Sequence, residues 1–85
     1  AAGVLYIARQ RGIAVPEELS IVGYDDTSIA AHVWPPLTTI RWPMVSMARS
    51  AARKLVRPEA AAQEPSLFLS DLIRRGSATA PRAAP

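Results

Sequence analysis

Apolar residues recur at every third or fourth position in two stretches of the chain, which is the spacing of one face of an α-helix. The first stretch contains Val4, Leu5 and Ala8, and Gly12 follows where helices commonly end in a left-handed residue. The second stretch follows Pro43, which fits the first turn of a helix because its missing N–H is not needed there. It ends before Pro58, and its apolar stripe consists of Met44, Met47, Ala48, Ala51, Ala52 and Leu55.

Short runs rich in β-branched residues predict the strands. Residues 20–24 favour a strand that is buried on both faces, and residues 37–42 alternate as a strand does. Residues 66–74 are interpreted as a final strand after a structureless connector at residues 59–65. Residues 78–85 are predicted to form a loose tail, since Ala, Pro, Thr and Arg bury little surface there. Helices that alternate with strands indicate an α/β fold.

A polar turn is predicted at residues 25–28, at the carboxyl end of the first strand. A short helix over residues 28–33 would follow it, with Asp26 or Thr27 as its cap. Two consecutive prolines would then end this helix before the second strand begins.

The length and composition limit what this chain can be. It has 85 residues and no cysteine, which excludes disulfides and thiolate metal sites and is compatible with a reducing compartment. A chain of this size buries only about 60–65% of its unfolded surface. Because it starts inside the first predicted helix without Met or a capping residue, we expect a fragment that self-associates or stays partly disordered when alone. No apolar run approaches the ~18 residues of a membrane span.

The net charge is +3 and the isoelectric point about 10.2, values that are common in nucleic-acid-binding proteins. The basic residues are dispersed, however, and Arg74 with Arg75 is the only adjacent arginine pair. The others lie at the spacings of two solvated helix faces: Arg9, Arg11, Arg49, Arg53, Lys54 and Arg57. We therefore interpret this charge as helix solvation and not as a surface that reads DNA.

Four stretches, in order and at matching separations, resemble the end of the effector domain of LacI/GalR-type bacterial transcriptional regulators. They are RGIAVPEELSIVGYDD at residues 11–26, PPLTTI at residues 35–40, the helix at residues 47–55, and LIRRGS at residues 72–77. The combination of the first two motifs is highly specific. By this resemblance the chain is identified as the C-terminal part of such a regulator.

The resemblance implies a fragment of a periplasmic-binding-protein-like (type I) fold, which is an α/β pair of Rossmann-like subdomains with the effector in the cleft. Residues 1–77 would contribute to both subdomains, crossing near Arg41 and returning near Pro65. It also implies a cytoplasmic homodimer without a cofactor or a membrane contact. The effector would be a sugar or a nucleobase-like molecule, and operator DNA would be bound only by an absent N-terminal helix-turn-helix.

Physical chemistry independently favours the polar turn as the effector site, because ligands of open α/β sheets bind outside the carboxyl ends of the strands. A carboxylate there can accept two charge-assisted hydrogen bonds, from vicinal sugar hydroxyls or from the N–H edge of a purine. The resemblance places the effector-binding aspartate at Asp25. The alternative is that the aspartates shape the turn and cap the next helix, and we favour this alternative for Asp26.

Arg41 and Trp42 lie at the predicted crossing, which faces the cleft in the family. Many relatives have Gln in place of Trp42, so this side chain is either a stacking platform for a sugar face or packing at the hinge. Met44 would line the pocket wall, with membership of the apolar helix stripe as the alternative.

The segment before the two prolines contributes to the dimer face in the family. Val33 and Trp34 are therefore the predicted interface residues, with core packing as the alternative. His32 is the only histidine, and neither a second imidazole nor a Cys is present to share a metal with it, which argues against a metal site or a triad.

The sequence favours the ligand-sensing part of a LacI-type regulator, in which an effector shifts a two-state equilibrium. The alternative is a solute-binding protein of a sugar transporter, which shares the fold. An enzyme is disfavoured because Asp25 and Asp26 are adjacent in a turn and no nucleophile–base pair or phosphate-binding glycine loop accompanies them.

Overall fold

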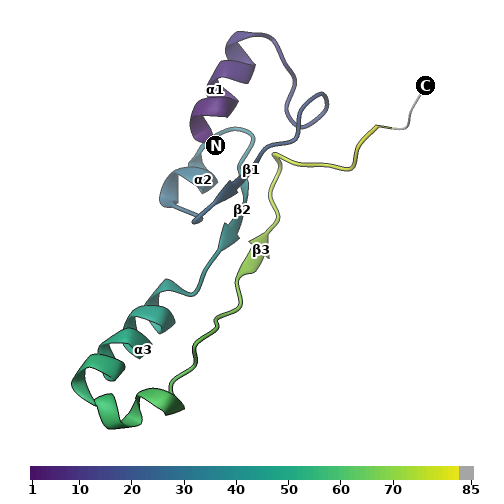
Figure 1. The fold of residues 1–85 in the computed structure, drawn as a ribbon. Helices are drawn as coiled ribbons and strands as arrows, with labels where there is room; N and C mark the ends of the chain where they lie inside the picture. The colour runs from purple at the N-terminus through teal and green to yellow at the C-terminus, as the bar shows by residue number, and fades with distance from the viewer. Residues whose placement is uncertain (83–85) are drawn as a thin grey trace. The chain divides into compact units, whose positions relative to one another are not determined.

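The computed structural model describes residues 1–82, and it divides into two compact units. The first unit contains Ala1–Arg41 and the described residues from Leu72 onward, and the second unit is Trp42–Asp71. Helices and strands alternate along the chain, as Figure 1 shows, so the predicted α/β class is confirmed.

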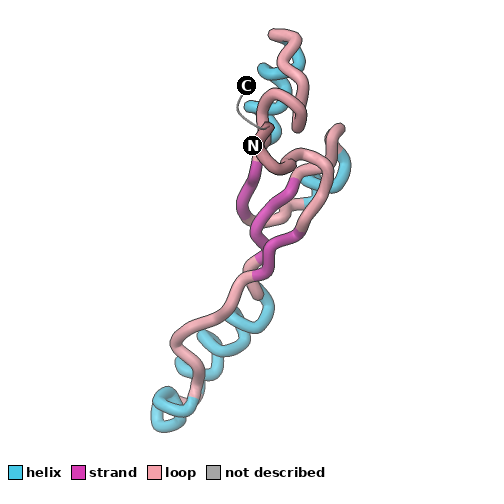
Figure 2. Tube along the Cα trace, turned by 90° about the vertical axis from the view of Figure 1, so that its right-hand side faces the viewer, coloured by secondary structure: helices cyan, strands magenta, loops and turns pink. Residues whose placement is uncertain are grey.

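A small sheet joins segments that are distant in sequence. Strands β1 (Val22–Tyr24) and β2 (Thr38–Arg41) are parallel, with Val22 opposite Thr38 and Tyr24 opposite Ile40. Strand β3 (Asp71–Ile73) follows in the order β1-β2-β3, and Figure 2 shows the three strands side by side. All three are shorter than predicted, the last one most of all.

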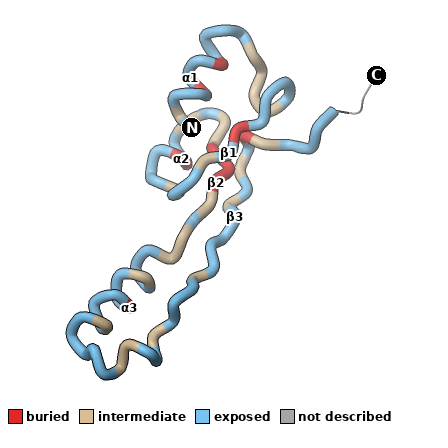
Figure 3. Tube along the Cα trace, in the orientation of Figure 1, coloured by how far each residue is buried: buried red, intermediate tan, exposed pale blue. Residues whose placement is uncertain are grey.

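One face of β1 and β2 carries the core of the first unit. Helices α1 (Ala2–Gln10) and α2 (Ser28–His32) contribute to it, and Gly12 after α1 has the left-handed φ of 69° that the sequence predicts. The start of α1 lies so close to β1 that a Cβ on Gly23 would be 3.3 Å from the Cβ of Ala1. The buried cluster consists of Leu5, Ile21, Ala30 and Leu37, and Figure 3 colours these and all other buried residues red.

The other face of β1 is open. Val22 is 55% exposed and Tyr24 is 65% exposed, so the prediction of a strand buried on both faces is wrong for this chain. Leu5 of α1 and Ala30 of α2 pack instead with Ile21 and Leu37, and no apolar layer within residues 1–82 covers Val22 and Tyr24.

The segment after β3 forms hydrogen bonds with both parallel strands at their amino ends. Ser77 is fully buried, and its hydroxyl donates to the carbonyl of Ile21 and accepts a 2.8 Å hydrogen bond from the N–H of Thr38. The N–H of Ile21 donates to the carbonyl of Ser77 at 2.8 Å. The same serine therefore satisfies backbone groups of both strands.

The segment that was predicted to be a loose tail is hydrogen-bonded to the first unit as far as Thr79. The hydroxyl of Ser20 accepts a 3.0 Å hydrogen bond from the N–H of Thr79 and donates to the Thr79 carbonyl at 3.2 Å. This contact uses the backbone groups of Thr79, and amino-acid composition does not predict contacts of the backbone. The expected tail at residues 83–85 lies outside the described residues.

The second unit contains helix α3 (Met44–Val56) and the 3₁₀-helix η1 (Pro58–Gln63), which replaces the structureless connector that was predicted. The two elements pack together, and buried Ser50 donates a 2.8 Å hydrogen bond to Glu64 Oε2. The predicted apolar stripe is largely uncovered in this chain, since Met44 is 59% exposed and Leu55 is 83% exposed. No helix within residues 1–82 is long and apolar enough to cross a bilayer.

We expect Ser77→Ala to lower the free energy of unfolding of the full-length protein by about 1–3 kcal/mol, because it leaves the Thr38 N–H and the Ile21 carbonyl buried without their partner. Chemical denaturation measures this change. The matched control is Thr79→Ala, which removes an exposed side chain from the same segment and should leave the unfolding free energy within about 0.5 kcal/mol of the wild type. Equal losses in both variants would contradict the clamping role of Ser77.

Candidate functional site

Two consecutive aspartates follow β1 in a tight turn. Asp25 has a φ of 87° and Asp26 a φ of 47°, a left-handed conformation that Asp tolerates better than most residues other than glycine. The N–H of Asp25 donates a 2.9 Å hydrogen bond to the carbonyl of Ile40, which holds the turn against the end of β2. Both aspartates are thereby placed at the carboxyl ends of parallel strands.

Asp26 binds two arginines from distant parts of the chain. Its side chain is only 7% exposed. Nη1 of Arg75 donates to Oδ1 at 2.7 Å, while Nε and Nη2 of Arg41 lie 2.8 Å and 2.7 Å from Oδ2. Each carboxylate oxygen therefore has its own guanidinium partner, and we call these three residues the Asp26 cluster.

Further hydrogen bonds fix this cluster to β2. Nη1 of Arg75 also donates to the carbonyl of Leu37 at 2.9 Å, and the backbone of Arg75 exchanges hydrogen bonds with the hydroxyl of Thr38. The N–H of Asp26 donates to Oγ1 of Thr39 at 3.2 Å. The side chain of Arg75 is only 19% exposed. Arg75 therefore connects β2 to the turn that contains Asp26.

The structure corrects the predicted capping role of Asp26 and agrees with Thr27, the other predicted cap. The N-cap of α2 is Thr27, and no side chain caps this helix. The carboxylate of Asp26 is engaged by the two guanidinium groups, which form stronger, charge-assisted hydrogen bonds than a neutral backbone N–H does. The adjacent pair of Arg74 and Arg75 was a signal of a special position, although nothing in the sequence linked it to Asp26.

The two arginines lower the pKa of Asp26 below its ordinary value of 3.8. The largest cause is the hydrogen bond from Arg75, followed by the hydrogen bond from Arg41, and burial of the carboxyl opposes both. The ionised form of Asp26 is therefore the form that the folded structure favours.

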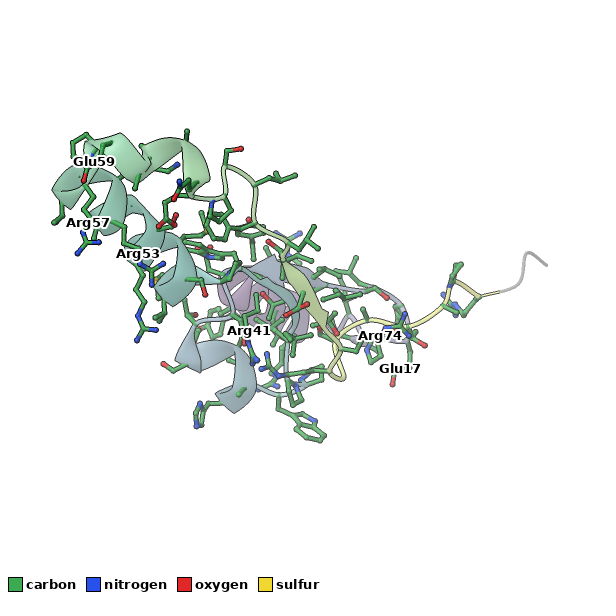
Figure 4. All side chains as sticks on the ribbon, turned by 90° about the horizontal axis from the view of Figure 1, so that it is seen from below. Glu17, Arg41, Arg53, Arg57, Glu59 and Arg74 are labelled. Carbon is green, nitrogen blue, oxygen red and sulfur yellow. The ribbon has the colours of Figure 1, made fainter. Side chains whose placement is uncertain are left out.

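The remaining predicted effector residues lie in different surroundings. Asp25 is exposed at the turn, and Arg41, at the end of β2, has a side chain that is 56% exposed. Figure 4 labels Arg41. Trp42 is half-buried and Met44 is exposed, and both belong to the second unit. The structure thus brings Asp25, Asp26 and Arg41 to one edge of the sheet.

The two predicted interface residues differ from one another. Val33 is partly buried and packs against the core cluster, as the core-packing alternative expects. Trp34 is 75% exposed, and the guanidinium of Arg9 donates to its carbonyl. The backbone of Trp34 is therefore bound by Arg9, while its indole ring exposes a large aromatic surface on the first unit.

Comparison with known proteins agrees with this architecture. Residues 1–78 match the family model described as periplasmic binding protein-like domain. The chain belongs to this family. It is 40% identical to the HTH-type transcriptional regulator MalR of Streptomyces coelicolor over 85 residues, which cover 95% of this chain and 25% of that protein.

Solved structures show the same likeness. A sugar-binding transcriptional regulator of the LacI family from Escherichia coli, complexed with phosphate, matches 95% of this chain and 30% of its own at a TM-score of 0.82 and 32% identity. A LacI family regulator from Lactobacillus casei with bound glucose matches 92% of this chain and 28% of its own, with a TM-score of 0.77 and 31% identity. This chain spans about a quarter to a third of these proteins.

We expect the Asp26 cluster to make stability depend on acid pH. A carboxyl with a depressed folded-state pKa contributes stability above its unfolded pKa of 3.8 and loses that contribution as the pH falls through the folded pKa. Between about pH 5 and pH 2, urea unfolding of wild type should therefore show a steeper loss of stability than unfolding of Asp26→Asn. Glu17→Gln, at an exposed turn position, is the control and should keep the wild-type slope. Identical slopes for Asp26→Asn and wild type would contradict the assignment.

Proposed function

We propose that this chain is the C-terminal part of the effector-sensing domain of a LacI-type transcriptional regulator, and that Asp25 binds a sugar or a similar small polar effector. The observation that carries the proposal is the acidic turn at the carboxyl ends of two parallel strands, in a chain whose relatives are transcriptional regulators. Ligands of open α/β sheets bind at that edge.

The chemistry of the turn suits a polyhydroxylated ligand. Asp25 is exposed, a carboxylate can accept hydrogen bonds from two neighbouring hydroxyls, and Arg41 offers donors at the end of the adjacent strand. Trp42 as an aromatic surface for a sugar face and Met44 as an apolar wall stay predictions from the sequence, and both residues belong to the second unit. The bound glucose in the Lactobacillus casei relative supports this choice of effector class.

The division of the chain into two units supports a sensor that spans two subdomains. The first boundary lies between Arg41 and Trp42, where the sequence predicts a crossing, and the second between Asp71 and Leu72, later than the predicted return near Pro65. Operator DNA would be bound by an N-terminal helix-turn-helix outside this chain, and the molecule would act as a cytoplasmic homodimer.

A solute-binding protein of a sugar transporter is not favoured. The relatives reported above are transcriptional regulators, and one of them matches this chain at 40% identity. Catalysis is likewise not proposed, because the carboxylate of Asp26 is occupied by Arg41 and Arg75 and is not available as an acid–base partner for Asp25.

The proposed function is tested by sugar binding to the full-length protein. Calorimetry with D-glucose, D-galactose and cellobiose as probes should detect binding of at least one sugar, and Asp25→Asn should weaken that binding by about 1.5–3 kcal/mol through loss of a charge-assisted hydrogen bond. Glu17→Gln is the matched control, because it removes an exposed carboxylate from a different turn. An unchanged dissociation constant in Asp25→Asn would limit this residue to shaping the turn.

We also propose Trp34 as a contact between two copies of the protein. An exposed indole that adjoins a fixed backbone offers a large apolar area at a small entropic cost. Trp34→Ala should weaken dimerisation of the full-length protein by about 2 kcal/mol or more in sedimentation equilibrium. Leu67→Ala, at another exposed apolar side chain, serves as the comparison. Equal dimer constants in wild type and Trp34→Ala would remove Trp34 from the interface.

A further inference from the structure

The guanidinium group of Arg41 is hydrogen-bonded to Asp26, yet more than half of the side chain is exposed. Its Nε and Nη2 both contact Oδ2 of Asp26, at 2.8 Å and 2.7 Å. The hydrogen bond and ion pair of this side chain run through Nε and Nη2, and 56% of the side chain is exposed. The guanidinium therefore has one edge fixed on Asp26, and more than half of the side chain faces outward.

The carboxylate that holds Arg41 is itself immobilised. Asp26 is 7% exposed, its Oδ1 receives Nη1 of Arg75 at 2.7 Å, and its N–H is bonded to Thr39. Arg75 is in turn tied to the Leu37 carbonyl at 2.9 Å. A chain of contacts thus leads from the middle strand through Arg75 and Asp26 to Arg41.

Fixing this side chain has a consequence for recognition. An arginine side chain has many rotamers, and a ligand that must immobilise it binds more weakly because this ordering costs entropy. A ligand that binds a guanidinium group that is already ordered avoids this cost. Arg41 stands at the end of β2 and Asp25 at the end of the neighbouring β1. A hydroxyl that accepts from Arg41 and a second that donates to Asp25 would match this pair of groups.

We propose that Asp26 is a positioning residue that holds Arg41 ready as a hydrogen-bond donor to the effector, with Arg75 fixing Asp26 from behind. The proposal rests on the proposed function, since it presumes that the Asp25 turn binds a sugar. Asp26 itself does not touch the effector, because both of its oxygens are occupied by guanidinium groups.

The binding experiment uses the full-length protein and the sugar among D-glucose, D-galactose and cellobiose that binds wild type. Asp26→Asn should weaken binding about tenfold, because Arg41 is released. In an Arg41→Gln background the same Asp26→Asn change should alter affinity by less than about twofold, since its target is already absent. A merely structural role of Asp26 would weaken binding equally in both backgrounds, and that result would overturn the proposal.

A second variant keeps the test decisive if Asp26→Asn does not fold. Arg41→Lys retains the positive charge but cannot place two nitrogens on Oδ2, so binding should again fall about tenfold. Wild-type affinity in Arg41→Lys would show that charge alone is needed and would overturn the positioning role. Glu17→Gln is the control for both variants and should bind as wild type does.

A measurement without ligand separates this proposal from the proposed function. The Nε–H of Arg41, assigned by its absence in Arg41→Gln, should exchange with solvent about tenfold more slowly in wild type than in Asp26→Asn, as followed by nuclear magnetic resonance. Rapid exchange in wild type would overturn the positioning of Arg41. Slow exchange without binding of any of the three sugars would overturn the sugar-sensing function and leave the Asp26–Arg41 contact established.

Discussion

The parallel pairing of β1 and β2 is the constraint on which the first unit depends, and it is completed by one buried serine hydroxyl. Two parallel strands leave unpaired backbone groups at their ends, and these groups are costly when buried. Ser77 meets this need for both strands, since its hydroxyl contacts the Ile21 carbonyl and the Thr38 N–H. The core of Leu5, Ile21, Ala30 and Leu37 forms only because the strands are held at this register.

The same strand register also determines which side chains meet in the Asp26 cluster. With Tyr24 opposite Ile40, the turn after β1 meets the end of β2, and Asp26 lies within reach of Arg41. A nearly buried carboxylate needs compensation, and two guanidinium groups provide it. One of them, Arg75, belongs to the segment that also carries Ser77, so the strand clamp and the site are built by neighbouring residues.

The exposed surfaces define what each of the two units presents to other molecules. The outward faces of Val22 and Tyr24, the ring of Trp34 and the stripe of α3 are apolar and uncovered within residues 1–82. Apolar side chains in such numbers are typical of surfaces that contact other protein. Part of the positive charge, in contrast, lies along the second unit, where Figure 4 labels Arg53 of α3 and Arg57 directly after this helix.

The sequence by itself determined the α/β class, the α1 and α3 helices, the left-handed Gly12 and the turn at Asp25, because periodicity, proline and glycine act over a few residues. It also determined the family, through ordered motifs that no single residue carries. Tertiary structure alone decided the partners of Asp26 and Ser77, since Asp26 is 49 positions from Arg75 and Ser77 is 56 positions from Ile21. Burial also depended on tertiary packing: Val22 and Tyr24 of β1 are exposed because no layer within residues 1–82 covers them, and Val33 packs against the core cluster while its neighbour Trp34 is exposed. Contacts between distant residues depend on register and packing, which local patterns do not encode.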